Sequence, residues 1–186
     1  MHPPHPHRLD RDRAQLLVVD IQEKLLPRID GHEAMLARAE QVIRAALVIG
    51  VPVTVSEQYV KGLGPTVARI RDAAGEAPRF EKLAFSFCDE PACRERIESL
   101  GRPQVILAGI ETHVCVLQTA LDLLAAGSTP FVVADAVGSR AARDYDVALA
   151  GLRSAGAAVT TAESAIFQLL RASGTALFKR VLPLVK

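Results

Sequence analysis

Three residues that lie far apart in the chain carry side chains that could act together on a carbonyl group: Asp20, Lys82 and Cys115. A thiolate is a strong nucleophile, a carboxylate can accept and return a proton, and a nearby ammonium group favours thiolate over thiol. Each residue also has an ordinary structural explanation. A lone cysteine is often a small buried apolar residue, an aspartate often caps a turn or helix, and a lysine usually lies in solvent.

The elements around these residues decide whether they can meet. An apolar run at 14–19 predicts a buried strand that ends at Asp20, and helix periodicity over 33–49 stops at Gly50. The rest of the chain repeats this alternation. Further strands are expected at 51–55, 80–85, 104–108, 131–134 and 157–161, and further helices at 66–74, 91–100, 112–126, 145–155, 162–172 and 176–182.

Alternating strands and helices predict an α/β fold with a parallel sheet covered on both faces, a three-layer, doubly wound sandwich. Chemistry in such folds lies beyond the carboxyl ends of the strands. Asp20, Lys82 and the segment 109–115 all lie at or just after the ends of expected strands. The fold therefore brings them to one rim.

Cys115 lies in the first turn of the helix expected to begin near Thr112. A helix N-terminus carries partial positive charge and free N–H groups, and both favour a thiolate. A nearby Lys82 ammonium would lower the pKa of the thiol further. The same N–H groups could bind an oxyanion.

Composition excludes several classes of function. The 186 residues carry a formal net charge of +1, without the basic excess of a nucleic-acid or membrane surface. No apolar run reaches the roughly 18 residues that a membrane span needs. The three cysteines are an odd number in a chain without an export signal, which favours reduced thiols in the cytoplasm.

The first residues differ from the rest of the chain. We expect a flexible arm over 1–13, rich in proline, histidine and charge, followed by a single domain over 14–186. His2, His5 and His7 could bind a metal weakly, but an unstructured tail is the preferred interpretation.

The chain resembles the isochorismatase-like cysteine hydrolases in three places. The motif VVDIQ spans 18–22, Lys82 follows a phenylalanine, and GIETHVCV spans 109–116. The resemblance extends from about 15 to 167. It implies a six-stranded parallel sheet. The segment 57–66 is similar to the same region in a subgroup of isochorismatase-domain proteins whose substrates are poorly defined.

The resemblance also implies roles for individual residues. Cys115 would be the nucleophile, Asp20 the proton acceptor and donor, and Lys82 their electrostatic partner. A cis peptide bond would join Ile110 to Glu111, and the backbone N–H groups of Glu111 and Cys115 would form an oxyanion hole. The substrate pocket would include Gln22, Leu25, Gln58, Tyr59, Phe85, Phe87, Ile110 and His113.

Two departures from the family narrow the expected chemistry. Nicotinamidases hold a metal with histidines near the second strand, whereas this chain has Ser56, Glu57 and Gln58 there. We therefore expect no metal, no other cofactor and a substrate other than nicotinamide. Enzymes that act on isochorismate itself can lack the cysteine, so Cys115 favours acyl transfer.

Three functions remain open from the sequence. The first is hydrolysis of a small amide or ureide C–N bond through an acyl-enzyme on Cys115. The second is a scaffold or binding protein with weak catalysis, and the third a thiol redox protein, which the absence of a C-x-x-C pair disfavours. We also expect a homo-oligomer, because the resemblance implies it: members of the family are commonly dimers or larger. The apolar segment 176–184 adds a physical reason, since it has more apolar surface than a free terminus usually carries.

Overall fold

The computed structural model describes residues 5–185. Its six strands form one parallel sheet in the order β3-β2-β1-β4-β5-β6. The strands are β1 (Ala14–Val19), β2 (Val53–Gln58), β3 (Arg79–Lys82), β4 (Gln104–Ile110), β5 (Thr129–Gly138) and β6 (Ala158–Thr160).

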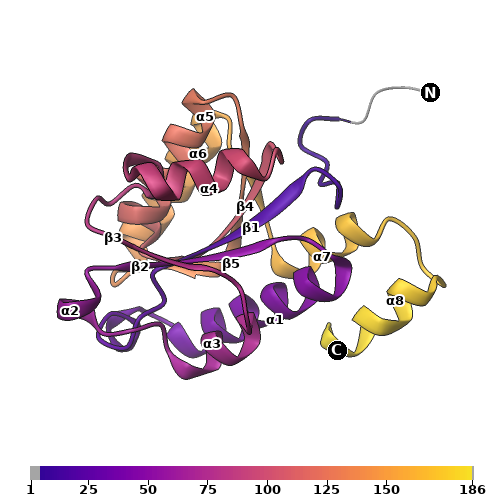
Figure 1. Ribbon diagram of the computed structural model, residues 1–186, viewed down its shortest axis with the longest axis horizontal. Coiled ribbons are helices and arrows are strands. Elements are labelled where there is room, and N and C mark those ends of the chain that lie inside the picture. The colour runs from indigo at the N-terminus through magenta and orange to yellow at the C-terminus, as the bar shows by residue number, and fades with distance from the viewer. Residues whose placement is uncertain (1–4, 186) are drawn as a thin grey trace.

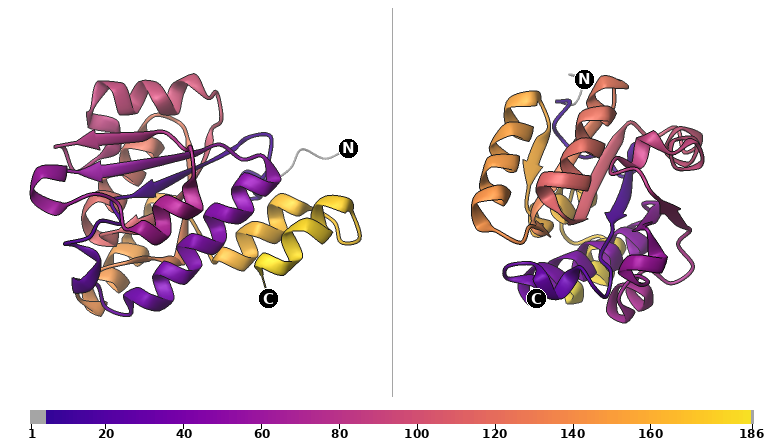
Figure 2. Two further views of the ribbon diagram at one scale, coloured as in Figure 1. Left: turned by 60° about the horizontal axis from the view of Figure 1, so that its bottom comes forward. Right: turned by 90° about the vertical axis from the view of Figure 1, so that its left-hand side faces the viewer.

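Helices cover both faces of this sheet, which confirms the three-layer, doubly wound α/β class (Figure 1). On one face lie α1 (His32–Ile49), α3 (Ala68–Ala74), α7 (Ala162–Leu170) and α8 (Ala176–Val181). On the other lie α4 (Pro91–Ser99), α5 (Leu117–Ala125) and α6 (Ala142–Ala155), as a second pair of views also shows (Figure 2). The short α2 (Val60–Leu63) follows β2.

The central strands are apolar on both faces because the side chains of each face pack in a separate hydrophobic core. In β1, Leu16 and Val18 pack with α1 and α7, whereas Leu17 and Val19 pack with α4 and α5. All four are at most 1% exposed. Each such side chain stabilises the fold by about 1.5–3 kcal/mol, so both helical layers are needed.

Several elements differ in their bounds from the sequence-based prediction, and two of these differences have a clear physical meaning. β5 is longer than expected because its polar residue Asp135 is satisfied inside the fold: its carboxylate accepts the N–H of Ala162 at the start of α7, at 2.7 Å. The helix expected at 112–126 is divided into a π-helical turn, Thr112–Val116, and α5. π-Helical turns within helices often occur at functional sites.

The N-terminal segment is not a free arm throughout. Leu9 has no exposed surface, and its N–H donates to Gln168 Oε1 at 3.0 Å. The N–H of Asp10 donates to Gln104 Oε1 at 2.8 Å. The expected flexible arm over 1–13 is therefore wrong at least from Leu9 onward, because an apolar side chain anchors it. His2 lies outside the described residues.

The C-terminal segment packs on its own domain, beside α1 (Figure 2). Val181 is fully buried, and Leu177 and Phe178 pack against the same core. Gln41 of α1 donates to the carbonyl of Leu184 at 2.8 Å. This apolar segment is therefore not the unpaired surface that the sequence suggested, and it gives no reason to expect a homo-oligomer.

Within residues 5–185, no helix is both long enough and apolar enough to cross a membrane.

Candidate active site

An ion pair without any exposed surface lies at the carboxyl edge of the sheet. Lys82 Nζ donates to Asp20 Oδ2 at 2.7 Å, and both side chains are 0% exposed. Lys82 also contacts Gln58 Oε1 at 2.7 Å and the carbonyls of Ala84 and Phe85 at 3.3 and 3.0 Å. A buried ammonium needs such partners because its desolvation is costly. Lys82 is therefore not a solvent-exposed surface lysine.

Asp20 reaches this position because the sheet reverses its strand order between β1 and β4. Ligand sites of doubly wound sheets lie at that point. Gly109, which pairs with Val19, allows β4 to come close to β1 beside Asp20. A Cβ at Gly109 would lie 2.0 Å from the carbonyl oxygen of Val19, and its φ of +120° also favours glycine.

Asp20 has a second hydrogen-bond donor that the sequence analysis missed. Ser56 Oγ donates to Asp20 Oδ1 at 2.7 Å, so both carboxylate oxygens are bound. Ser56 is fully buried in β2, next to β1 in the sheet. A serine in an apolar strand was the available signal, but only the strand register shows its partner.

Two of the residues expected to bind substrate, Gln22 and Gln58, support the ion pair. Gln22 is fully buried and exchanges hydrogen bonds with the backbone of Gln58 at 2.7 and 2.9 Å. It also donates to the carbonyl of Gly64 at 2.6 Å. Gln58 donates to the carbonyl of Leu83 while it accepts from Lys82. These two amides fix the loops that surround the lysine.

Cys115 lies in the π-helical turn and is 6% exposed. Burial, followed by the negative charge of Asp20, raises the pKa of its thiol to about 12, while Lys82 acts in the opposite direction. The expected lowering of this pKa is therefore wrong for the resting site, because desolvation outweighs the positive charge. A thiol in this state needs a base to remove its proton, and the Asp20 carboxylate is close enough to influence it.

The turn that carries the cysteine is held by the segment after β5. Glu111 Oε2 accepts hydrogen bonds from Arg140 Nε at 2.9 Å and from the Arg140 N–H at 3.1 Å. His113 Nδ1 lies 3.0 Å from Ser139 Oγ. The peptide bond between Ile110 and Glu111 is cis. Arg140 was not identified from the sequence, because an exposed arginine in a loop carries no local signal.

The remaining residues expected in the substrate pocket fall into two groups. Phe87 and Ile110 have no exposed surface, and Phe87 packs edge-to-face on Phe80 at 6.0 Å between ring centroids. They belong to the two cores, and their contact with a substrate stays a prediction. Tyr59 and Phe85 are 46% and 53% exposed. Leu25 and His113 are partly buried, so these four stay candidates for contact with a substrate.

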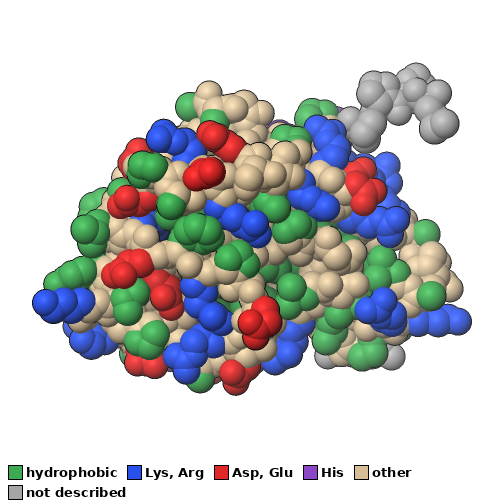
Figure 3. All heavy atoms as spheres, in the orientation of Figure 1, with side chains coloured by type: hydrophobic (Ala, Val, Ile, Leu, Met, Phe, Trp, Pro, Cys, Tyr) green, Lys and Arg blue, Asp and Glu red, His purple; other side chains and the backbone are tan. Residues whose placement is uncertain are grey.

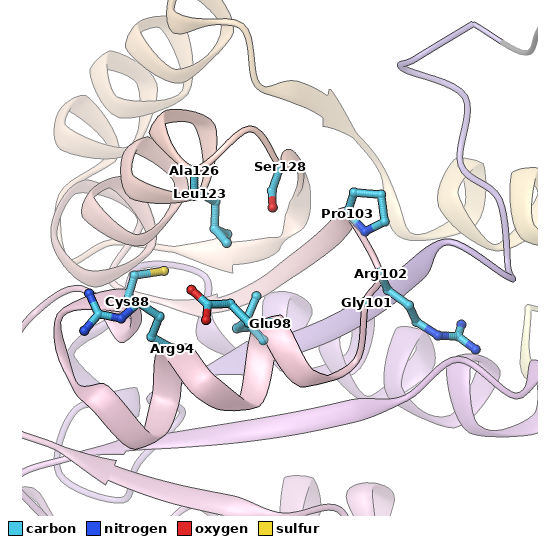
Figure 4. A pocket seen from close by; sticks show the side chains of 10 residues that line it. Cys88, Arg94, Glu98, Gly101, Arg102, Pro103, Leu123, Ala126 and Ser128 are labelled. Atoms are coloured by element: carbon cyan, nitrogen blue, oxygen red, sulfur yellow. The ribbon is translucent and has the colours of Figure 1, made fainter.

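A separate cavity of about 400 Å³ lies between α4 and α5 (Figure 4). Cys88, Glu98, Leu123 and Ser128 are among its lining residues, whereas Asp20, Lys82 and Cys115 are not. Burial raises the pKa of the Cys88 thiol to about 11. The reactive groups of the rim therefore do not share this cavity.

The described part of the chain offers no cluster of three or more histidine, cysteine, aspartate or glutamate side chains arranged to hold a metal ion. The absence of a metal requirement stays a prediction.

Comparisons with known proteins identify the family of this chain. The model of the isochorismatase domain matches residues 14–164. Isochorismatase domain-containing protein 2A of Mus musculus is 40% identical over 172 residues, which cover 92% of this chain and 82% of that protein. The chain therefore belongs to the isochorismatase-like hydrolase family, which confirms the resemblance seen in the sequence.

Solved structures share the fold closely. The MAR1 ribonuclease from Caenorhabditis elegans superposes with a TM-score of 0.90 at 38% identity, covering 96% of this chain and 92% of that one. The YcaC gene product from Escherichia coli, an octameric hydrolase of unknown specificity, has a TM-score of 0.90 at 24% identity, covering 98% and 92%. At that identity, the second likeness supports the fold alone.

Proposed function

We propose that this protein hydrolyses the C–N bond of a small amide or ureide through an acyl-enzyme on Cys115. The observation that carries the proposal is the fully buried Asp20–Lys82 pair beside a buried thiol. Burying two charges costs several kcal/mol per ion before their attraction is counted. A pair maintained at the carboxyl edge, next to a nucleophile, is better explained by catalysis than by stability.

The first half-reaction forms the acyl-enzyme. Asp20 accepts the thiol proton as the sulfur of Cys115 attacks the carbonyl carbon, giving a tetrahedral oxyanion. The C–N bond then breaks, and Asp20 returns the proton to the leaving nitrogen, which departs as ammonia or an amine. The raised pKa of the Cys115 thiol fits this order, since the proton leaves only when the attack occurs.

The second half-reaction restores the cysteine. Water attacks the thioester carbon while Asp20 accepts one of its protons, and collapse of the oxyanion releases the acid. The proton on Asp20 returns to the sulfur. Lys82 stays charged and keeps Asp20 aligned in both halves. The N–H groups of Glu111 and Cys115 would bind the oxyanion, a contribution of about 3–4 kcal/mol per donor in other acyl-transfer enzymes.

The partners proposed are a small-molecule substrate and further copies of this chain. Assembly as a homo-oligomer is proposed from the family alone, whose members are commonly dimers or larger. Light scattering at micromolar concentration tests it, and a monomer would contradict it. We also propose a reducing, cytoplasmic location, because Cys88, Cys93 and Cys115 are all free thiols.

RNA is the competing substrate, because three similar solved structures are named as ribonucleases or putative ribonucleases. The face shown in Figure 3 mixes acidic and basic side chains rather than presenting one basic surface. Together with the formal net charge of +1, this favours a small substrate over a polyanion.

A panel of primary amides and ureides tests the proposal, with release of ammonia or amine as the readout. We expect turnover of at least one compound by the wild type and none by Cys115→Ala. RNA cleavage that survives in Cys115→Ala would contradict the proposal. A scaffold, the alternative without useful catalysis, predicts no turnover of any compound.

A further inference from the structure

The nucleophile turn, defined here as residues 111–115, is held on its β5 side mainly by the pair Glu111–Arg140. The Glu111 side chain is only 9% exposed, whereas that of Arg140 is 55% exposed. The arginine binds the carboxylate twice, through its backbone N–H and through Nε. Its backbone bond survives truncation of the side chain, so the guanidinium can be removed without releasing the loop completely.

The charge of Glu111 poses a problem for the proposed chemistry. The backbone N–H of this residue is one of the two proposed donors to the oxyanion. Its own nearly buried carboxylate would repel the negative charge that develops there, because such charges are weakly screened. Among the residues that the structure describes, Arg140 is the cation paired with this carboxylate.

We propose that Arg140 is a positioning residue for the oxyanion hole. Its guanidinium neutralises Glu111 and fixes the side chain, so the N–H of Glu111 meets the developing oxyanion without an opposing charge. The inference rests on the proposed function for the nucleophile Cys115 and adds a residue that touches neither the thiol nor the substrate.

Two thiol reagents separate this role from a general structural one. With iodoacetamide, the sulfur–carbon bond forms as the carbon–iodine bond breaks, and the charge leaves on iodide. With acrylamide, the sulfur bonds to the terminal alkene carbon, and the alkene electrons move onto the amide oxygen as an enolate. The α-carbon then takes up the proton that Asp20 received from the thiol. Only acrylamide places negative charge on an oxygen during the reaction.

The experiment compares the second-order labelling rates of Cys115 by both reagents, measured by mass spectrometry of the Cys115 peptide. We expect Arg140→Ala to react with acrylamide about tenfold more slowly than the wild type, less than the loss of a whole oxyanion donor. We expect the iodoacetamide rate to change by less than about twofold. Arg143→Ala removes the same charge from an exposed position three residues later and is the matched control. It should resemble the wild type with both reagents.

A second variant tests the charge argument directly. Glu111→Gln combined with Arg140→Ala removes the uncompensated carboxylate but leaves an amide oxygen for the Arg140 backbone N–H. We expect this double variant to recover most of the acrylamide rate that Arg140→Ala loses. Such a rescue would indicate that Glu111 and Arg140 act on the rate through each other. Destabilisation of the loop alone would not produce it.

Three outcomes would overturn the inference. Equal slowing with both reagents would indicate a structural role, and no slowing with either would indicate no role. A double variant as slow as Arg140→Ala would remove the charge argument. If neither reagent labels Cys115 in the wild type, the nucleophile itself is wrong. That result overturns the proposed function, and the role of Arg140 with it, and differs from the other three.

Discussion

The candidate site at the carboxyl edge of the sheet has two halves that are built differently: an acid–base half around Asp20 and Lys82, and a nucleophile half at residues 111–115. In the acid–base half, both oxygens of Asp20 are hydrogen-bonded, Lys82 has four acceptors, and neither side chain is exposed. In the nucleophile half, Cys115 has a raised pKa, and Thr112 Oγ1 is a buried side-chain atom without a partner among the described residues. The first half is complete at rest, whereas the Cys115 thiol of the second becomes charged only during reaction.

This difference separates stability from reactivity. Removal of a partner from the acid–base half leaves a buried charge unpaired, which destabilises the fold as well as the reaction. Changes in the nucleophile half should reduce the reaction and leave the fold nearly intact. The following predictions test this separation, from the largest expected effect to the smallest.

Lys82→Ala should give the largest loss. It leaves the Asp20 carboxylate buried without its cation, so we expect the free energy of unfolding to fall by about 3–5 kcal/mol. Turnover should fall on the order of a hundredfold or more. Urea denaturation and the amide panel measure the two effects.

The control is Lys61→Ala, which removes an exposed lysine of α2 and should change stability by less than about 0.5 kcal/mol. Equal stability of the two variants would contradict the description of the acid–base half.

Gly109→Ala should destabilise the protein by about 3 kcal/mol or more. The new Cβ would meet the Val19 carbonyl at 2.0 Å, and a φ of +120° is strained for alanine. Gly151→Ala in α6 is the matched control, because nothing lies within 4 Å of its Cβ position. We expect that control to stabilise the protein by about 0.5–1 kcal/mol through helix propensity. Effects of the same sign on the thermal midpoint would contradict the close approach of β1 and β4.

Ser56→Ala should cost less than either change. It removes one hydrogen bond to a carboxylate that keeps its lysine, so we expect a loss of about 1.5–3 kcal/mol in stability. Turnover should fall less than in Lys82→Ala. A stability equal to that of the wild type would mean that Ser56 does not support Asp20.

We expect the Cys115 thiol to make a smaller contribution to stability, and one that depends on pH. Its pKa of about 12 in the folded state lies above the ordinary value of 9.0, so the folded state holds the proton more tightly. The resulting stabilisation is fully present below about pH 9 and is lost as the pH rises from 9 through 12. Between pH 9 and 10 we expect the wild type to lose about 1 kcal/mol more than Cys115→Ala. The two proteins should be compared by urea denaturation under reducing conditions, and parallel pH profiles would contradict the raised pKa.

Much of the fold was predictable because its strands are short apolar runs between helices. β1 was predicted with its observed bounds, and α1 differs by one residue at its start. β5 was predicted too short because Asp135 interrupts its apolar run, and only the start of α7 explains why a carboxylate is tolerated there. α2 was missed because four residues show no helical period.

The site was predictable to the extent that its residues follow strands. Asp20, Lys82 and Cys115 were candidates by type and position, since a parallel sheet brings the ends of its strands together. The family resemblance then selected them as a set. The sign of the Cys115 pKa shift was not predictable, since it depends on how deeply the thiol is buried. Ser56 and Arg140 act across strand pairs, so their roles require the register of β2 with β1 and of β5 with β4.

The central claim is that Asp20 is the base for a thiol whose pKa it also raises. The most direct test is the rate of iodoacetamide labelling of Cys115 at pH 7 in Asp20→Asn, with circular dichroism to verify the fold. Removal of the carboxylate leaves Lys82 free to stabilise the thiolate, so labelling should become about tenfold faster or more, while hydrolysis of any substrate is lost. Slower labelling, or hydrolysis retained in the folded variant, would contradict the account.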